Sequence, residues 1–487
     1  MSSAASVLGA ARPGDTGSAP GGGRTLARRD AVDLPVAERP LRVAMFAPLP
    51  PVPSGIAAYV LDLLPLLPAP WRIDLFGDTD VEADAGRLDA TRTGVVCFPH
   101  PEFAARQAAE PYDLTVYQVG NSTERTWMFR YVVEHPGLLV LHDGVLHPAR
   151  VEDATRRGDM AGYRRIAESC RPEAGAALGH LVAGGLGGPA LYTTFPLCED
   201  LVRASWATGM HGELLCGWLR AMVPDARVVR LAHWQSVGRD PRPPGVAVRG
   251  ESGVGEARYR GTPAGGGPQD VREERGTGGR SNGTAGACER WRSELARPEE
   301  VLIGSFGNIG RERRLEQLLN ALAGIETATP WRLIVAGSVD PRLRLREQAE
   351  GLGIAERITW RAGLSDADFV AAMGAVDLAV NLRFPPARAS SGVLHQLLQL
   401  GIPVVITDVL HWRDYPAAAV ARVPPGPDDA EAAALRAALA RWIDDPEARA
   451  AAGRAAAEWA RAHITPERMR DSYVAAAQAA LGLSGLE

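Results

Sequence analysis

The sequence lacks lysine: the 53 basic residues of this 487-residue chain are all arginines. This absence excludes the Walker A phosphate loop, the pyridoxal-phosphate Schiff base and the kinase phosphate lysine, because each requires a lysine amine. A bias in base composition explains it more simply than a functional demand does. The net charge of −5 at pH 7 gives no support to a nucleic-acid partner.

Long apolar runs and paired cysteines are also missing. The run at 61–67 is far shorter than the ~20 residues of a membrane helix, and the N-terminus has no apolar segment typical of a secretory signal. We therefore expect a cytoplasmic protein without a transmembrane segment. The five cysteines are scattered, with no Cys-x-x-Cys pair, so reduced thiols are expected and no metal site is predicted.

The length exceeds what one hydrophobic core usually supports, which favours two domains. Two segments rich in Gly, Pro and Arg contain too few apolar residues to fold. We predict a disordered tail at 1–38, an α/β domain at 39–237, a disordered linker at 238–298, a second α/β domain at 299–464, and a C-terminal helix at 465–487 that packs back on the first domain.

Short apolar runs alternate with segments of helical spacing in both halves, which is typical of doubly wound parallel sheets. The fold class is therefore α/β, with two Rossmann-like domains facing a central cleft at the carboxyl ends of their strands. The runs expected to be strands are 41–47, 71–76, 93–98, 113–119 and 137–142 in the first half, and 301–306, 331–336, 357–360, 377–381 and 402–407 in the second.

The loop after the first strand, PLPPVPSGIAAY at 48–59, leads into an amphipathic helix. Gly55 lets the backbone approach a ligand where the first helical N–H groups are unpaired, which suits a phosphate or a carboxylate. A plain strand–helix connection is an equally good interpretation of this loop alone.

In the second half, the strand at 301–306 leads into GNIGRERRLEQLL, which places Gly307, Arg311 and Arg313 at the edge of the cleft. Arg313 could clamp a diphosphate through two hydrogen bonds. Taken alone, a run such as RERR is more often a solvated helix face.

The segment from Asp377 to Val409 contains the strongest signal. After the strand ends, a proline-rich loop leads to Ser390, Ser391 and Gly392, which begin a helix whose amides and dipole attract phosphate. Arg383, at the strand end, could reach this phosphate or a neighbouring carboxylate, and both interpretations remain open.

At these residues the sequence resembles the retaining GT-B glycosyltransferases, which use nucleotide-sugar donors and include glycogen and sucrose synthases and bacterial mannosyltransferases. The resemblance covers most of 41–479. Its first-domain motifs are the 48–59 loop, VGNSTERTWMF at 119–129 and VLHDGVLH at 140–147; its second-domain motifs are NLRFPPARASSG at 381–392 and VPPGP at 423–427.

The resemblance implies sugar transfer from a nucleotide-diphosphate donor, with retention of configuration and without a metal or other cofactor. It implies that Arg313, with Arg311, and the amides of Ser391 and Gly392 stabilise the leaving diphosphate. His142, beside Asp143, would meet the sugar and the acceptor, whereas Asn121 and His147 would lie on the acceptor side. The acceptor would be a sugar, a lipid-linked molecule or a natural product.

Several positions depart from the family pattern. Ala389 and Gln396 stand where the family commonly has glutamates, and Gln396 could still bond a ribose or sugar hydroxyl. Ala58 and Arg125 stand where related sequences often have Asp and His, and Arg313 stands at the usual lysine position. The alternative function is therefore a catalytically degenerate subunit that binds a partner enzyme or a nucleotide sugar.

Overall fold

The computed structural model describes residues 35–49, 54–78, 95–237 and 284–483. The two segments predicted to be disordered are 1–38 and 238–298. Residues 1–34 and 238–283, which make up most of them, lie outside the described ranges. The remaining parts of both segments are ordered, which corrects both predicted boundaries. Residues Val36–Glu38 form a 3-10 helix (η1) with Val36 buried, and Thr284–Leu295 form helix α12, which packs against α15 (Asp366–Gly374). Leu295 is buried, which explains why this part of the linker folds.

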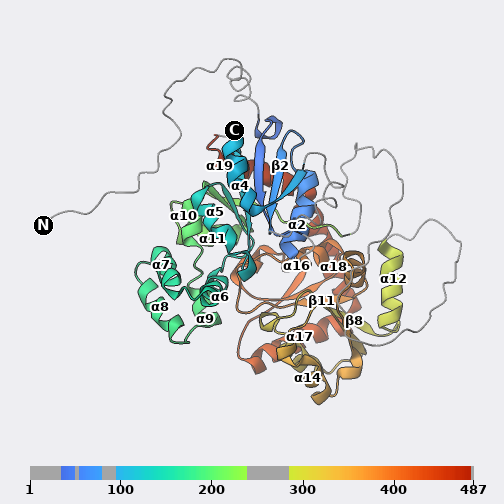
Figure 1. Cartoon of the computed structure of the whole chain (residues 1–487). Coiled ribbons are helices and arrows are strands. Elements are labelled where there is room, and N and C mark those ends of the chain that lie inside the picture. The colour runs from blue at the N-terminus through green and yellow to red at the C-terminus, as the bar shows by residue number, and fades with distance from the viewer. Residues whose placement is uncertain (1–34, 50–53, 79–94, 238–283, 484–487) are drawn as a thin grey trace, which may run out of the picture.

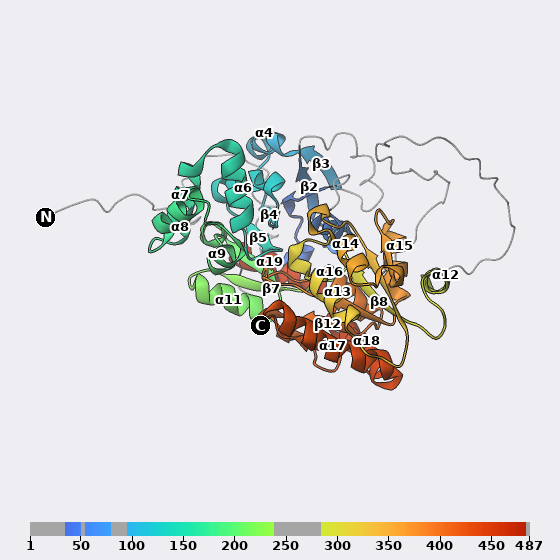
Figure 2. The ribbon, with the colours of Figure 1, turned by 90° about the horizontal axis from the view of Figure 1, so that it is seen from below.

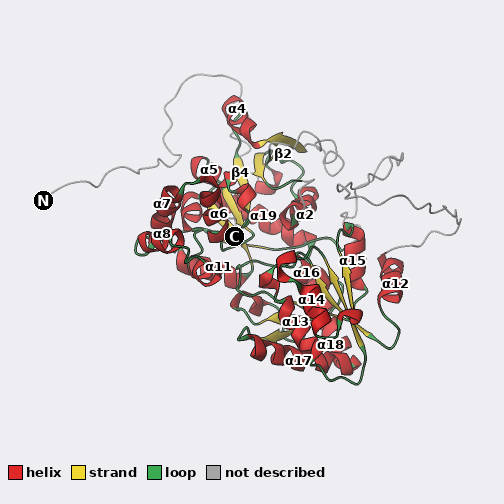
Figure 3. Ribbon diagram, turned by 60° about the horizontal axis from the view of Figure 1, so that its bottom comes forward, coloured by secondary structure: helices red, strands yellow, loops and turns green. Residues whose placement is uncertain are grey.

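The first domain is built on a parallel seven-stranded sheet of order β3-β2-β1-β4-β5-β6-β7. Every residue of β4 and β5 is buried, as expected for strands that helices cover on both faces. Figure 3 shows this layering. The strands are β1 (Arg42–Phe46), β2 (Arg72–Gly77), β3 (Val95–Pro99), β4 (Leu114–Val119), β5 (Leu138–Leu141), β6 (Ala207–His211) and β7 (Val228–Leu231).

The helices of this domain lie between successive strands along the chain. They are α2 (Gly55–Leu63), α4 (Phe103–Ala109), α5 (Trp127–Glu134), α6 (His147–Arg157), α7 (Met160–Cys170), α8 (Gly175–Ala183), α9 (Pro189–Thr194), α10 (Glu199–Ala204) and α11 (Glu213–Met222). Short 3-10 turns follow α2 and precede α4 and α5: η2 (Leu64–Leu66), η4 (His100–Glu102) and η5 (Thr123–Arg125).

The second domain has a parallel six-stranded sheet of order β10-β9-β8-β11-β12-β13, the strand order of a dinucleotide-binding fold. Its strands are β8 (Val301–Phe306), β9 (Trp331–Ala336), β10 (Ile358–Arg361), β11 (Leu378–Asn381), β12 (Val404–Thr407) and β13 (Val420–Val423). Its helices, besides α12 and α15, are α13 (Leu315–Ala323), α14 (Leu345–Gly351), α16 (Gly392–Gln399), α17 (Asp428–Asp444) and α18 (Pro446–His463). Its 3-10 turns are η6 (Arg311–Arg313), η7 (Pro341–Leu343), η8 (Ala355–Arg357) and η9 (Leu410–Asp414).

The last helix, α19 (Pro466–Ala480), returns to the first domain and packs against β5, β6, β7 and α2 (Figure 1). Its Tyr473 hydroxyl lies 3.0 Å from the hydroxyl of Tyr59 on α2. One cluster of buried apolar residues runs through both domains and includes Met45 and Leu397. The two sheets are therefore joined by a shared core as well as by the chain.

A helical layer, α6 to α10, is inserted between β5 and β6, and the sequence motifs did not predict it. It has a small core of its own, which includes Tyr163 and Leu178. Figure 2 shows α7 and α8 at the outer side of the first domain, away from the second. No helix in the part of the chain that the structure describes is long and apolar enough to span a membrane.

Candidate functional site

The strand orders place a topological switch point in each sheet, between β1 and β4 and between β8 and β11. In open α/β sheets, ligands bind outside the carboxyl ends of the strands at such a point. The predicted residues follow these strands: Gly55 comes after β1, Asn121 after β4, Gly307 after β8 and Arg383 after β11.

Backbone groups join the two domains across this cleft. The N–H of Gly144 donates to the carbonyl of Arg388 (3.0 Å), and the N–H of Val145 donates to that of Ala387 (3.2 Å). Asp143 and Ala389 form an antiparallel bridge. The proline-rich loop of the second domain therefore lies directly against the end of β5, next to His142.

The connection after β7 also contacts both domains. His233 Nδ1 lies 2.6 Å from Ser390 Oγ, and the Gln235 amide lies between the carbonyl of Gly55 (3.5 Å) and Gly392. A Cβ atom on Gly392 would come within 1.8 Å of Gln235 Oε1. A side chain at this position would therefore displace the Gln235 amide, which contacts the start of α16.

We expect Gly392→Ala to destabilise the protein by roughly 1–2 kcal/mol, because the methyl group must displace the largely buried Gln235 amide. The double variant Gly392→Ala/Gln235→Ala should recover part of this loss, since it removes the obstructed side chain. Chemical unfolding measures both effects. Gly217→Ala on α11, where an added Cβ meets nothing within 4 Å, is the control, and equal destabilisation by both alanines would contradict this contact.

Two guanidinium groups of the second domain, those of Arg313 and Arg383, lie near each other. Nη1 of Arg313 donates to Asn381 Oδ1 at 2.7 Å, while the Nε atoms of both arginines are buried without a hydrogen-bond partner. Burial, reinforced by the proximity of Arg383, lowers the pKa of Arg313 to about 9. Burial also lowers the pKa of Arg383, against the opposing effects of Asp143 and Glu312.

The first turn of α16 lies beside these arginines. Ser391 is the N-cap, and its Oγ accepts hydrogen bonds from the Leu394 N–H (3.3 Å) and from Asn381 Nδ2 (3.1 Å). Gly307, with a φ of +98°, lies against the Arg313 guanidinium: a Cβ there would be 2.9 Å from Nη2. This arrangement combines unpaired positive charge with a helix N-terminus, which suits an anion.

His142 and Asp143 belong to the first domain and directly follow β5. His142 Nε2 lies 2.8 Å from Gln118 Oε1, and its ring contacts Tyr59 edge-on at 4.8 Å. Burial, with a smaller effect of His211, lowers the pKa of His142 well below 6.5, so the imidazole is neutral at pH 7. Burial raises the pKa of Asp143, although the Asn121 N–H bond and Arg383 oppose this.

His142 is one end of a row of four imidazoles that crosses the domain interface. Its ring lies 5.2 Å from that of His211, which lies 4.9 Å from His233, which in turn lies 4.7 Å from His395 on α16. Burial is the largest cause of a lowered pKa in each, with values of about 4 for His211 and about 3 for His395. We call this set the imidazole row.

Two predicted residues, His147 and Gln396, are bound within the protein, and for His147 this makes the predicted acceptor contact wrong. His147 is fully buried, and both ring nitrogens are bound within the first domain, Nδ1 to the Phe195 carbonyl (2.6 Å) and Nε2 to the Tyr163 hydroxyl (2.7 Å). It therefore supports α6 and does not face an acceptor. The Gln396 Nε2 donates to the carbonyl of Ser236 at 2.8 Å, so this amide also holds the interdomain segment.

The other predicted residues lie at or near the cleft. Asn121 donates its N–H to Asp143 and accepts from the Ala149 N–H, which caps the first turn of α6. Arg311 is exposed in η6, two residues before Arg313. Three amides were not predicted, because single amides near strand ends follow no pattern: Gln118 bonds His142, Asn381 bonds Arg313, and Gln235 lies against Gly392.

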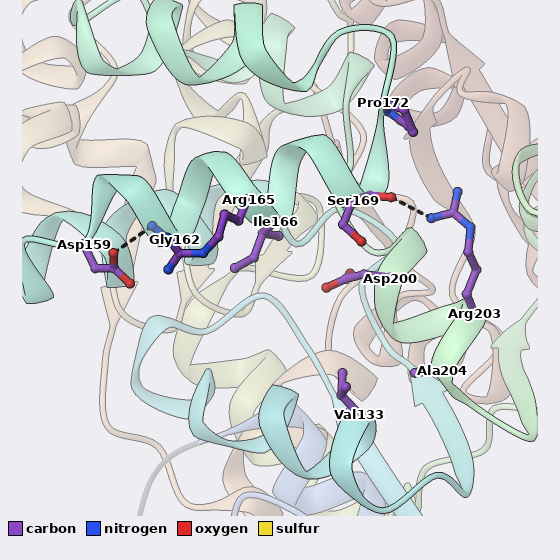
Figure 4. A pocket seen from close by; sticks show the side chains of 10 residues that line it. All are labelled: Val133, Asp159, Gly162, Arg165, Ile166, Ser169, Pro172, Asp200, Arg203 and Ala204. Carbon is purple, nitrogen blue, oxygen red and sulfur yellow. Dashed lines mark hydrogen bonds between the residues drawn. The ribbon is translucent and has the colours of Figure 1, made fainter. Parts of the chain in front are cut away.

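No group of His, Cys, Asp and Glu residues within the described ranges could hold a metal ion. A hollow of about 850 Å³ lies elsewhere, on the outer face of the first domain between α5, α7 and α10 (Figure 4). In it, Arg203 donates to the carbonyl of Ser169, and Val133 and Ile166 supply apolar surface. This hollow does not include any of the predicted site residues.

Known proteins resemble this chain in fold. Residues 289–459 match the model of the family described as Glycosyl transferases group 1. None of the curated proteins matches the sequence.

Among solved structures, Anabaena Alr3699/HepE in complex with UDP and glucose has a TM-score of 0.55 at 13% identity, covering 89% of this chain and 98% of that one. A sucrose-phosphate synthase from Thermosynechococcus elongatus has a TM-score of 0.56 at 14% identity, and the match covers 89% of this chain and 97% of that one. A glycosyltransferase from Rickettsia africae has a TM-score of 0.57 at 9% identity, and the match covers 91% of this chain and 99% of that one. Residues 289–459 therefore match the group 1 glycosyl transferases, and the two domains together have the GT-B fold.

Proposed function

We propose that this protein transfers a sugar from a nucleotide-diphosphate donor to an acceptor, with retention of configuration and without a metal ion. The observation that carries the proposal is the pair Arg313 and Arg383, whose Nε atoms are buried and unpaired beside the start of α16. Neither guanidinium has an ion pair within the described ranges. Burying such a charge is costly unless an anion compensates it, and a donor diphosphate supplies that anion.

The proposed roles follow from the two walls of the cleft. Arg313, Arg383 and the amides at the start of α16 would stabilise the diphosphate as it leaves, because preorganised donors act most strongly on developing charge. On the other wall, neutral His142 would bond the sugar or the attacking hydroxyl. The likeness to a structure solved with UDP and glucose supports UDP as the first nucleotide to test.

His142→Ala tests the enzymatic part of the proposal. We expect turnover to fall by about 100-fold or more, with little change in donor affinity, because the partner of His142 appears mainly as the reaction proceeds. Donor affinity is measured by calorimetry with and without a chelator, and turnover by sugar transfer or slow donor hydrolysis. His180→Ala on exposed α8 is the control. Donor binding that disappears with chelator would contradict the metal-independent mechanism.

The alternative of a non-catalytic subunit is favoured by one observation. Ala389 contributes no carboxylate, and its backbone is paired with Asp143, so its position acts as a domain contact. In that case the wild-type protein would bind donor without transfer or hydrolysis, and His142→Ala would change only stability.

A further inference from the structure

Asn381 is the last residue of β11 and one of the few buried polar residues below the cleft, with 3% of its surface exposed. Both ends of its amide are bound. Oδ1 accepts from Arg313 Nη1 at 2.7 Å, and Nδ2 donates to Ser391 Oγ at 3.1 Å. One side chain therefore connects the Arg313 guanidinium to the cap of α16.

The orientation of this amide is fixed by its partners. Arg313 can only donate, so it requires the Asn381 oxygen, and the amide NH₂ must then face the serine hydroxyl. Gly307 contacts the other side of the guanidinium. Arg313 is thus held between a glycine backbone and a neutral amide, while its Nε keeps no partner.

Because Asn381 is uncharged, it binds Arg313 without neutralising the charge of the guanidinium. A carboxylate at the same place would hold the guanidinium more strongly, but it would also cancel its charge. Asn381 orients Arg313 with an uncharged acceptor, beside the second guanidinium of Arg383. The carboxyl groups that act on these arginines, Glu312 and Asp143, do so from beyond hydrogen-bond contact.

We propose that Asn381 is a positioning residue for the anion site: it aims Arg313 and couples it to Ser391 while leaving the positive charge available to the donor phosphates. This inference rests on the proposed function, since it assigns a role in binding the same diphosphate. It assigns no contact between Asn381 and the ligand.

Asn381→Asp separates this role from a structural one, because it keeps the shape and the bond to Arg313 but adds a negative charge. We expect the thermal midpoint to be maintained or raised by the new ion pair, while the affinity for inorganic pyrophosphate and for UDP falls at least tenfold. Asn381→Ala should lower both the midpoint and the affinity. Asn320→Asp is the matched control, since Asn320 on α13 also accepts one side-chain hydrogen bond, from Gln348. This variant should bind pyrophosphate and UDP as tightly as the wild type does.

A double-mutant cycle tests whether Asn381 acts through Arg313. In the Arg313→Ala background, Asn381→Ala should cost little further pyrophosphate affinity. Equal losses in both backgrounds, or an Asn381→Asp affinity equal to that of Asn320→Asp, would overturn this inference alone. A wild-type protein that binds neither UDP, GDP, ADP nor pyrophosphate would overturn the proposed function together with it.

Discussion

Alanine in place of Arg313 should lower the affinity for a nucleoside diphosphate by roughly 10- to 150-fold. The expected loss is the ~1.5 to 3 kcal/mol of a hydrogen bond to a charged group. Folding stability should change little, because the lost bond to Asn381 is offset by relief of the repulsion between Arg313 and Arg383. Calorimetry with UDP, GDP and ADP measures the affinity, and chemical unfolding measures the stability.

Arg342→Ala is the matched control for this variant. Arg342 occupies the 3-10 turn η7 after β9, as Arg313 occupies η6 after β8, but its side chain is 87% exposed and paired with Asp340. The control should bind nucleotide as the wild type does. An Arg313→Ala affinity within twofold of the wild type would remove Arg313 from the site.

The imidazole row should make stability fall steeply as the solution is acidified. Folding lowers the pKa of His211 from 6.5 to about 4 and that of His395 to about 3, in both cases chiefly through burial. The unfolded chain therefore takes up protons first as the pH falls below 6.5. The stabilisation is fully present above pH 6.5 and is lost on acidification, at ~2.7 kcal/mol per pH unit for the two residues together between about pH 6 and 4.

His211→Phe isolates the contribution of one residue. Neither ring nitrogen of His211 makes a hydrogen bond of normal geometry, so phenylalanine should replace the ring without loss at pH 7. Because phenylalanine does not titrate, the variant should retain ~3 kcal/mol more stability than the wild type near pH 4, relative to their difference at pH 7. Urea unfolding across pH 4 to 8 gives both values. His180→Gln, at an exposed site on α8, should leave the pH dependence unchanged, and parallel curves for His211→Phe and wild type would refute the assignment.

Much of the fold could be predicted from local pattern. The strand predicted at 331–336 coincides with β9, and those at 113–119 and 402–407 contain β4 and β12, because apolar runs without alternation are typical of buried parallel strands. A helix start at Ser390 to Gly392 was also predicted, and Ser391 does cap α16. These features depend on neighbours in the sequence.

Three strands were not predicted: β6, β7 and β13. The run ATGMH of β6 contains a polar residue and Gly209, whose missing Cβ makes room for Leu231 on the neighbouring strand. A short run of this composition carries no strand pattern. The strand exists because its two neighbours provide the hydrogen-bonding partners, which is information held by the tertiary structure.

The same distinction applies to the site. Glycines and arginines after strand ends could be predicted, because the sheet topology brings those ends to one edge. His147 was misassigned since it follows the strand end at His142 by only five residues, yet the chain has turned into α6 by then and buries the ring. The members of the imidazole row come from four separate segments of the chain, so no local pattern indicates that they meet.

The position of α19 has a consequence for how the protein is made. Tyr473 on this helix bonds the hydroxyl of Tyr59 and the amide of Gln118, more than 350 residues earlier in the chain. While the ribosome is still synthesising the second domain, these groups of the first domain have no partner and the apolar surface that α19 covers on β5, β6 and β7 is open. The first domain is therefore the first to emerge and the last to be completed, and a nascent chain that stops before residue 466 exposes an apolar surface to chaperones and to other chains.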